Sequence, residues 1–352
     1  MSDGDRIAVA LSGGADSAAA AVILKGRGFE VITLTMRLAE HDDSAVDCAA
    51  GVALALGVEH RVIDLRSEFE RLVVRPFVEA YASGLTPNPC VNCNREMKFT
   101  LLLREAQGIG CRYLATGHYA GITGGGDRPF TLKRPVDRGR DQTYVLWTLG
   151  QATLKHVLFP LGTLTREDVA VTISEAGITC RAMGSQDICF LDGGPYADLV
   201  AVRAPGRVRP GPILDTGGNV LGEHRGLARY TVGQRKGLGL GGPGSLYVLE
   251  IRPDDNTLVV GPRERLFCRE FPVAGVRFSS GAWSPGTVSC QVMTRYRGPA
   301  LPASLELDSG GRGIVRYRET GPPAAPGQSA VFYRGDELLG GSFIERGGLT
   351  LP

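Results

Sequence analysis

The N-terminal third of the chain alternates between two hydrophobic patterns. Residues 6–11 are a short apolar run typical of a buried strand, and residues 31–36, 60–65 and 112–118 are interpreted as three further strands. The stretches between them are interpreted as helices, at residues 15–27, 45–56, 67–82 and from about Arg95 onward. Strands that alternate with helices predict a doubly wound parallel sheet, which binds ligands at the carboxyl ends of its strands. Ser12, Met36 and Gly117 fall at such ends, so we expect them to meet at one crevice.

The pattern changes in the second half of the chain. Residues 141–177 are predicted to form a helical segment. After about residue 204 the chain becomes rich in Gly and Pro and continues as short alternating segments, which are typical of small β units. The predicted fold class is therefore multidomain α/β plus β, with a doubly wound parallel sheet, a helical insert and two small β domains, the last barrel-like. We place the domains at residues 1–203, 204–262 and 263–352.

The composition is that of a globular protein, with 352 residues of which 43% are hydrophobic and 22% charged. No apolar run approaches the roughly 18 residues of a membrane span, so we expect no membrane partner. The start, MSDGDRIAVALSGG, leads directly into a strand and a glycine loop, which predicts no signal peptide and a cytoplasmic location. The net charge of +2 neither supports nor excludes a nucleic-acid partner.

Residues 12–17, Ser-Gly-Gly-Ala-Asp-Ser, join the first strand to the first helix. Glycines let the backbone approach a phosphate, and the N–H groups at a helix start bind the anion. Asp16 is suited to hold Mg²⁺ beside the phosphates. The GK[ST] ending of a Walker loop is absent. A plain glycine turn is the alternative, but the loop resembles SGGxDS of the PP-loop ATP pyrophosphatases, which cleave ATP to AMP and pyrophosphate.

Residues 86–99, TPNPCVNCNREMKF, contain a Cys-x-x-Cys pair. The prolines restrict the backbone, so we expect a rigid exposed loop and a helix that begins just after Cys93. A thiol at a helix N-terminus has a lowered pKa and is more nucleophilic, and Arg95 and Lys98 add positive charge nearby. The pair alone also fits half of a zinc site, a dithiol redox site or two core cysteines. Five other cysteines are interpreted as structural: Cys48, Cys111, Cys180, Cys268 and Cys290.

Seven motifs in order indicate a family: SGGADS, TPNPCVNCNREMKF, ATGHYA, GRDQTYVL, SQDICF, TVGQRKGLGLGG and MTRYRG. Together they resemble the tRNA-specific 2-thiouridylase (MnmA/TrmU) family, from about residue 6 to residue 345. The resemblance implies that ATP adenylates the C2 oxygen of the wobble uridine in tRNA. It also implies a persulfide on Cys189, supplied by a cysteine desulfurase or sulfur-relay protein, with Cys93 as a nucleophile. The products are 2-thiouridine, AMP and pyrophosphate.

The same resemblance implies two sets of binding residues. It places ATP, with Mg²⁺, on Ala10, Leu11, Ser12, Gly13, Gly14, Ala15, Asp16, Ser17, Met36 and Gly117. It places tRNA on Asn88, Pro89, Cys90, His118, Arg140, Asp141, Gln142, Arg295, Tyr296 and Gln328. Taken without the family, Met36 is interpreted as a core residue at a strand end and most of the polar residues as solvated surface.

Two positions depart from the family. Many members have aspartate at the position of Cys90, and valine is common at the position of Ala15. Three thiolates, on Cys90, Cys93 and Cys189, suit a [4Fe–4S] cluster of the kind found in related RNA thiolases. The sequence leaves this cluster and the metal-free persulfide route open.

Two other classes of protein stay open as well. One is another PP-loop enzyme, either an amide-forming ligase or a small-molecule thiolase. The other is a sulfur carrier or iron–sulfur protein that no longer turns over. The intact nucleotide loop speaks against the carrier, and the β domains speak against a small substrate.

Overall fold

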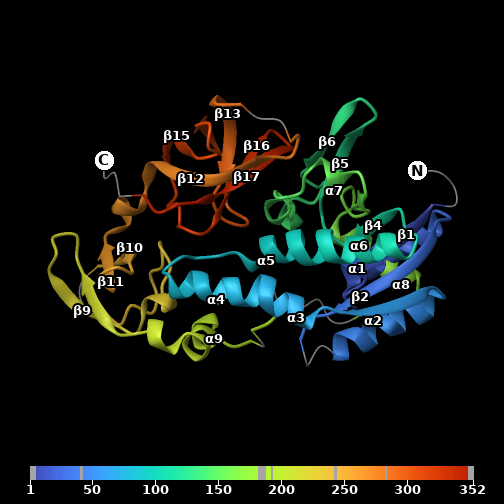
Figure 1. Cartoon of the computed structure of the whole chain (residues 1–352), viewed down its shortest axis with the longest axis horizontal. Coiled ribbons are helices and arrows are strands. Elements are labelled where there is room, and N and C mark those ends of the chain that lie inside the picture. The colour runs from blue at the N-terminus through green and yellow to red at the C-terminus, as the bar shows by residue number, and fades with distance from the viewer. Residues whose placement is uncertain are drawn as a thin grey trace.

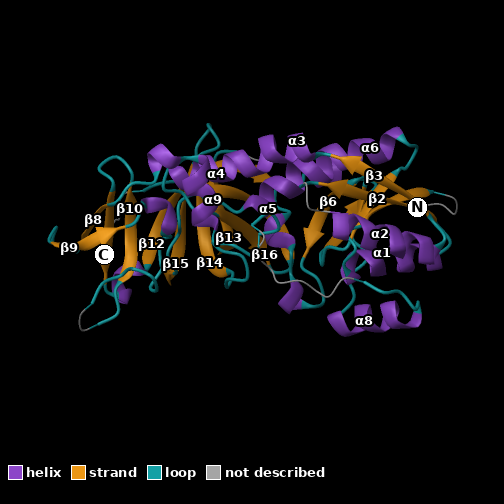
Figure 2. Cartoon of the chain, turned by 90° about the horizontal axis from the view of Figure 1, so that it is seen from below, coloured by secondary structure: helices purple, strands orange, loops and turns teal. Residues whose placement is uncertain are grey.

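A computed structural model of the chain describes residues 5–39, 43–180, 188–191, 193–241, 244–281 and 284–347. The molecule is elongated. An α/β unit lies at one end, a small β sheet at the other and a larger β structure between them (Figures 1 and 2). No helix within the described ranges is long and apolar enough to cross a membrane.

The α/β unit is built on a five-stranded sheet with the order β3-β2-β1-β4-β7, and every pairing in it is parallel. Its strands are β1 (Arg6–Ala10), β2 (Glu30–Arg37), β3 (Glu59–Asp64), β4 (Tyr113–Thr116) and β7 (Val157–Leu158). The four strands expected from the sequence are confirmed. The fifth, β7, lies inside the segment predicted to be helical, and that part of the prediction is wrong.

Helices cover both faces of this sheet, as Figure 2 shows. One face carries α1 (Ala15–Gly26), α2 (Asp43–Leu56) and α8 (Arg166–Glu175). The other face carries two long helices. The first consists of α3 (Arg66–Phe69), η1 (Glu70–Val74) and α4 (Arg75–Ala82), and the second of α5 (Pro89–Asn92), η2 (Cys93–Leu102) and α6 (Leu103–Gly108). Alternate strand residues serve the two faces. Ile7 and Val9 pack in one apolar cluster and Ala8 in the other, which explains why β1 is apolar along nearly its whole length.

The segment from residue 141 to residue 156 has little regular helix. It contains only short turns, at η4 (Thr143–Val145) and α7 (Gln151–Leu154). Tyr144 and Trp147 are buried there, and both bond to Ser329 of the neighbouring β structure: the Tyr144 hydroxyl donates to the backbone carbonyl and Trp147 Nε1 donates to the side-chain oxygen, each at 2.9 Å. These long-range contacts outweigh the local helical pattern.

The β part consists of two sheets. The small sheet has the order β10-β11-β8-β9, with β8 (Gly211–Leu214), β9 (Val220–His224), β10 (Tyr247–Arg252) and β11 (Thr257–Gly261), and α9 (Tyr196–Arg203) precedes it. The larger sheet is a closed antiparallel barrel of β12 (Cys268–Phe278), β13 (Gly286–Met293), β14 (Leu301–Leu307), β15 (Gly313–Gly321), β16 (Ser329–Arg334) and β17 (Glu337–Ile344). It closes because β12 pairs with both β15 and β17. The predicted fold class is therefore confirmed.

A hairpin from the α/β unit extends the barrel sheet. Strands β5 (Gly121–Gly125) and β6 (Arg128–Lys133) pair with each other, and β6 pairs with β17. Nothing in the sequence pattern indicated this pairing. The predicted domain limits stay a prediction, although β8–β11 lie within 204–262 and β12–β17 within 263–352.

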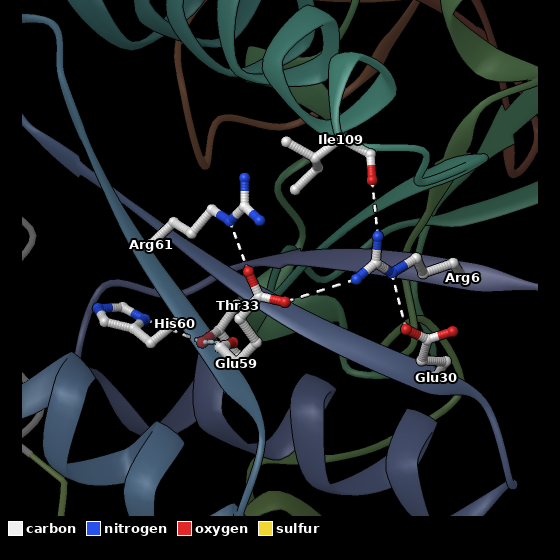
Figure 3. Close-up of polar contacts among 7 residues, drawn as sticks. All are labelled: Arg6, Glu30, Thr33, Glu59, His60, Arg61 and Ile109. Carbon is white, nitrogen blue, oxygen red and sulfur yellow. Dashed lines mark hydrogen bonds and ion pairs between the residues drawn. The ribbon is translucent and has the colours of Figure 1, made fainter.

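A charged network closes the sheet edge at the amino ends of the strands (Figure 3). Arg6 pairs with Glu30 at 2.8 Å and with Glu59 at 3.5 Å, and its Nη1 donates to the carbonyl of Ile109 at 2.8 Å. Arg61 also pairs with Glu59. This edge is opposite the Ser12–Ser17 loop. The network therefore joins the amino ends of β1, β2 and β3 and does not involve the carboxyl ends, where the ligand site is expected.

Candidate active site

The Ser12–Ser17 loop is shaped by its own hydroxyl groups. Ser17 Oγ donates to the carbonyl of Gly14 at 2.9 Å and accepts from the backbone N–H of Ser12 at 3.2 Å. Gly13 has φ +75°, a left-handed conformation that favours glycine. No side chain caps α1, which begins immediately after Gly14, so its first N–H groups are available to an anion.

Two contacts tie this loop to the end of β4. A Cβ atom on Gly117 would lie 2.6 Å from both the carbonyl carbon of Asp16 and the nitrogen of Ser17. Gly117 is therefore required by space. The Tyr119 hydroxyl donates to Asp16 Oδ1 at 3.0 Å. Tyr119 stands in the ATGHYA motif but was not among the site residues expected from the sequence.

Cys48, which the sequence pattern indicated to be structural, also contacts the Ser12–Ser17 loop. Cys48 of α2 donates from Sγ to the carbonyl of Gly13 at 3.4 Å. Ser12, Met36 and Gly117 lie at or just after the carboxyl ends of β1, β2 and β4. Met36 is half-buried against two apolar clusters. The observed packing of Met36 is that of a core residue at a strand end.

In the first cysteine motif, the helix starts at an earlier residue than the sequence indicated. Helix α5 starts at Pro89, and the Asn88 side chain accepts from the N–H of Cys90 at 3.1 Å as its N-cap. The expected start after Cys93 is wrong, because proline is favourable in the first turn and asparagine is a good cap. Cys90 is exposed and Cys93 is half-buried, one turn into the helix.

The expected lowering of the Cys93 pKa is not observed. Burial raises the pKa of the Cys93 thiol, and the positive charge of Lys98 opposes this only in part. The helix N-terminus does not help Cys93, because the helix begins at Pro89. A nucleophilic Cys93 therefore depends on Lys98 for positive charge.

Part of the second cysteine motif is described. Ser185, Gln186 and Asp187 lie outside the described residues, whereas Ile188, Cys189 and Phe190 are within them, and Cys189 is exposed. The Phe190 ring packs edge-on against Phe69 at 5.7 Å. The cluster that includes Phe69 also contacts Cys93, so the fold brings both cysteine motifs to the same apolar cluster.

The three candidate cluster ligands do not form a metal site in this arrangement. Within the described residues, which include Cys90, Cys93 and Cys189, no three Cys, His, Asp or Glu side chains converge closely enough to hold a metal ion. The donor set therefore does not fit an iron–sulfur cluster as it stands here.

His118 lies in the interior between the two halves of the site. Its Nδ1 lies 2.7 Å from the hydroxyl of Thr116, and its ring packs 5.8 Å from Phe99 of η2. Burial holds the pKa of His118 well below its ordinary value, so the ring is neutral. His118 thus links the helix that carries the cysteines to Gly117 beside the nucleotide loop.

The Arg140–Gln142 turn is held at both ends. Gln142 Oε1 accepts from the backbone N–H of Tyr119 at 2.8 Å. Asp141 pairs with Arg134 at 3.3 Å and accepts from the hydroxyl of Thr143 at 2.6 Å.

The barrel residues of the predicted RNA surface lie near this turn and near the long helix formed by α5, η2 and α6, which carries Cys90 and Cys93 and is called the cysteine helix below. Arg295 is exposed, and the half-buried Tyr296 ring lies 6.0 Å from Tyr144. Burial raises the pKa of Tyr296, the neighbouring Arg297 opposes this rise, and Asp141 and Cys90 add to it. The expected tRNA residues therefore gather from three separate parts of the chain.

Gln328, one of the expected tRNA residues, makes a structural contact with the segment before the cysteine motif. Its Nε2 donates to the carbonyl of Thr86 at 2.9 Å, and the Thr86 N–H donates to the carbonyl of Pro326 at 2.8 Å. The barrel thus holds the segment that leads to Asn88 and Pro89.

Three protein-family profiles match consecutive parts of the chain. They are described as a tRNA methyl transferase HUP domain over residues 5–193, a tRNA methyl transferase PRC-barrel domain over residues 202–262 and an aminomethyltransferase beta-barrel domain over residues 269–344.

Curated relatives match over nearly the whole length. The tRNA-specific 2-thiouridylase MnmA of Chloroflexus aurantiacus is 41% identical over 352 residues, which cover 97% of this chain and 98% of that protein. MnmA of Herpetosiphon aurantiacus is 39% identical over 351 residues, which cover 96% and 98%. Among solved structures, the U34-tRNA thiolase NcsA from Methanococcus maripaludis with its [4Fe-4S] cluster aligns at 17% identity over 58% of this chain and 69% of that one, with a TM-score of 0.38. A likeness at that level carries no argument about the cluster.

Proposed function

The chain belongs to the tRNA-specific 2-thiouridylase family, and from this membership we propose an ATP-dependent tRNA sulfurtransferase that works through a persulfide. Nucleotide binding by a PP-loop and tRNA thiolation are properties of the family. The observation that carries the finer proposal is the common packing of Cys93 and of Phe190, the residue after Cys189, on one apolar cluster.

The first step activates the uridine. The C2 oxygen attacks the α-phosphorus of MgATP, an O–P bond forms and pyrophosphate leaves. The open N–H groups at the start of α1 bind the phosphates, and Asp16 assists the Mg²⁺ that arrives with ATP. Adenylate is a far better leaving group than the original carbonyl oxygen, so the next step becomes feasible.

The second step transfers sulfur. A cysteine desulfurase or relay protein places a sulfur atom on Cys189 as a persulfide. Either its terminal sulfur attacks C2 and expels AMP, after which Cys93 attacks the Cys189 sulfur, or Cys93 first frees hydrosulfide, which then attacks C2. Both routes close a Cys93–Cys189 disulfide, which a thiol reductant must reopen before the next turnover.

The test is pyrophosphate exchange into ATP with and without unmodified tRNA, combined with nucleoside analysis for 2-thiouridine. We expect exchange that depends on tRNA. Cys93→Ala and Cys189→Ala abolish thiolation but keep the exchange, and Cys290→Ala, in the barrel core, changes neither. Exchange without tRNA would indicate a ligase, and no exchange would indicate a carrier.

A separate measurement distinguishes the persulfide from the cluster. We favour the metal-free route because Cys90, Cys93 and Cys189 do not converge as a ligand set. On this route Cys90→Asp keeps activity, and protein reconstituted anaerobically contains no stoichiometric iron or sulfide. Bound iron that is lost together with activity in Cys90→Asp would establish the cluster instead.

A further inference from the structure

The loop after β4 joins the nucleotide loop to the Arg140–Gln142 turn through one residue, Tyr119. Its side chain is 1% exposed, and its hydroxyl donates to Asp16 Oδ1 at 3.0 Å. No step of the proposed reaction uses Tyr119. A buried hydroxyl bonded to a carboxylate is a strong, oriented contact, so it fixes the direction of that carboxylate.

The backbone of Tyr119 is fastened to the turn. Its N–H donates to Gln142 Oε1 at 2.8 Å, and its carbonyl accepts from the backbone N–H of Gln142 at 3.1 Å. The two bonds run in opposite directions between the same two residues. A displacement of Gln142 therefore moves the backbone of Tyr119 with it.

The Tyr119 ring has little room to absorb such a displacement. It packs in a cluster with Ala19 of α1 and Val169 of α8. Two residues earlier, Gly117 lies against the backbone of Asp16 with no space for a Cβ atom. Close packing of this kind transmits a shift because the neighbours cannot be compressed.

The far side of the turn is anchored to the barrel. The Thr143 hydroxyl donates to Asp141 and lies 3.0 Å from the hydroxyl of Tyr333 on β16. The turn is thus held between the barrel and Tyr119. A ligand that settles on the turn acts on an element with rigid contacts on both sides.

We propose that Tyr119 is a positioning residue that couples RNA binding at the Arg140–Gln142 turn to the orientation of the Asp16 carboxylate. The inference rests on the proposed function, in which the turn contacts tRNA and Asp16 assists MgATP. tRNA on the turn fixes Gln142 and the backbone of Tyr119, and the hydroxyl then holds Asp16 ready for activation. The uridine is then adenylated by ATP only when tRNA is bound at the turn.

Such coupling is reciprocal in binding, so it is measurable without turnover. The experiment is titration of unmodified tRNA onto the full chain, with and without Mg²⁺ and a non-hydrolysable ATP analogue. We expect the analogue to tighten tRNA binding by about tenfold in the parent chain. In Tyr119→Phe this factor falls to about one, while each ligand alone binds within about twofold of the parent.

Two further variants complete the design. Tyr317→Phe, which alters another buried tyrosine in the barrel core, keeps the full coupling factor. Gln142→Ala loses coupling together with some tRNA affinity, and the double variant with Tyr119→Phe loses no more coupling than either alone, as expected of two residues on one path.

Three results would overturn the proposal: a coupling factor near one in the parent chain, full coupling in Tyr119→Phe, or additive losses in the double variant. Each is distinct from a failure of the proposed function, which would show as a parent chain without tRNA-dependent pyrophosphate exchange.

Discussion

Single residues control how closely the two halves of the site approach each other. Gly117 is the clearest case, because the backbone of Asp16 and Ser17 occupies the space of its missing side chain. The need for glycine becomes visible only when a Cβ atom is placed on Gly117. The structure gives a spatial reason for a glycine that the sequence presents only as part of a motif.

Gly117→Ala is expected to displace the nucleotide loop. The new methyl group meets backbone atoms at 2.6 Å, and backbone cannot move aside as a flexible side chain can. We expect ATP affinity to fall by at least about tenfold, measured by calorimetry. Gly121→Ala is the matched control, since its nearest neighbours lie at 3.5 Å. Equal affinities in the two variants would refute the spatial argument.

At the scale of elements, the cysteine helix changes its winding where the chemistry is expected. Segment η2 is a π-helix, in which residues five apart share hydrogen bonds, and the Thr100 hydroxyl accordingly donates to the carbonyl of Arg95 at 2.7 Å. This winding brings Lys98 toward the same face as Cys93, five residues earlier. An α-helix would turn the two side chains apart.

Lys98→Met is expected to make Cys93 less reactive. The pKa of Cys93 is already raised by burial, and Lys98 lowers it, so removal of the charge raises it further. Thiolate is then scarcer at any given pH. At pH 8 alkylation of Cys93 by iodoacetamide becomes about tenfold slower, and its pH profile moves to higher pH.

Peptide mapping by mass spectrometry follows Cys93 separately from the other cysteines. Lys98→Arg restores the rate because the charge returns, and Lys133→Met, on strand β6, leaves it unchanged. An alkylation rate in Lys98→Met equal to that of the parent would show that Lys98 does not act on Cys93.

The start of the same helix depends on its cap. Asn88→Ala removes the acceptor for the Cys90 N–H and is expected to lower the free energy of unfolding by about 1 kcal/mol, measured with urea. Asn88→Asp retains an acceptor and most of the stability. Asn92→Ala, at the end of α5, is the control for loss of an asparagine. A loss as large in Asn92→Ala would argue against the capping role.

At the scale of the whole molecule, the barrel is part of the site rather than an appendage. It holds Thr86 through Gln328, pairs β17 with β6 and lies against Trp147, where a Cβ on Gly341 would be 2.6 Å from the indole. The barrel therefore fixes the positions of the segment before the cysteine helix and of the β5–β6 hairpin.

Ser329→Ala tests this docking. It leaves the buried Trp147 N–H without its acceptor, so we expect a loss of about 1–3 kcal/mol in the free energy of unfolding. Ser289→Ala, at an exposed position of β13, serves as the matched control and should cost little. Two variants of equal stability would mean that the Trp147 contact contributes nothing.

Much of the molecule was determined by local sequence patterns. Four strands and most helices of the α/β unit followed from the local pattern. Strands β1, β2 and β4 are apolar because both of their faces are covered, whereas β3 is an exposed edge strand with polar residues. The nucleotide loop and the cysteine motifs were equally visible, since glycines, prolines and thiols restrict or enable chemistry where they stand. The start of α5 is also encoded locally, because asparagine at position 88 is a good N-cap and proline follows it.

Only the tertiary structure decided what these pieces do together. It added β7 and the β5–β6 hairpin, removed helix around Tyr144, raised the pKa of Cys93 and brought Phe190 to the cluster beside it. It also joined Tyr119 to Asp16. Each depends on contacts between residues far apart in the chain, which local spacing does not encode. The sequence by itself therefore determined the chemical groups and the family, and the fold determined which groups meet.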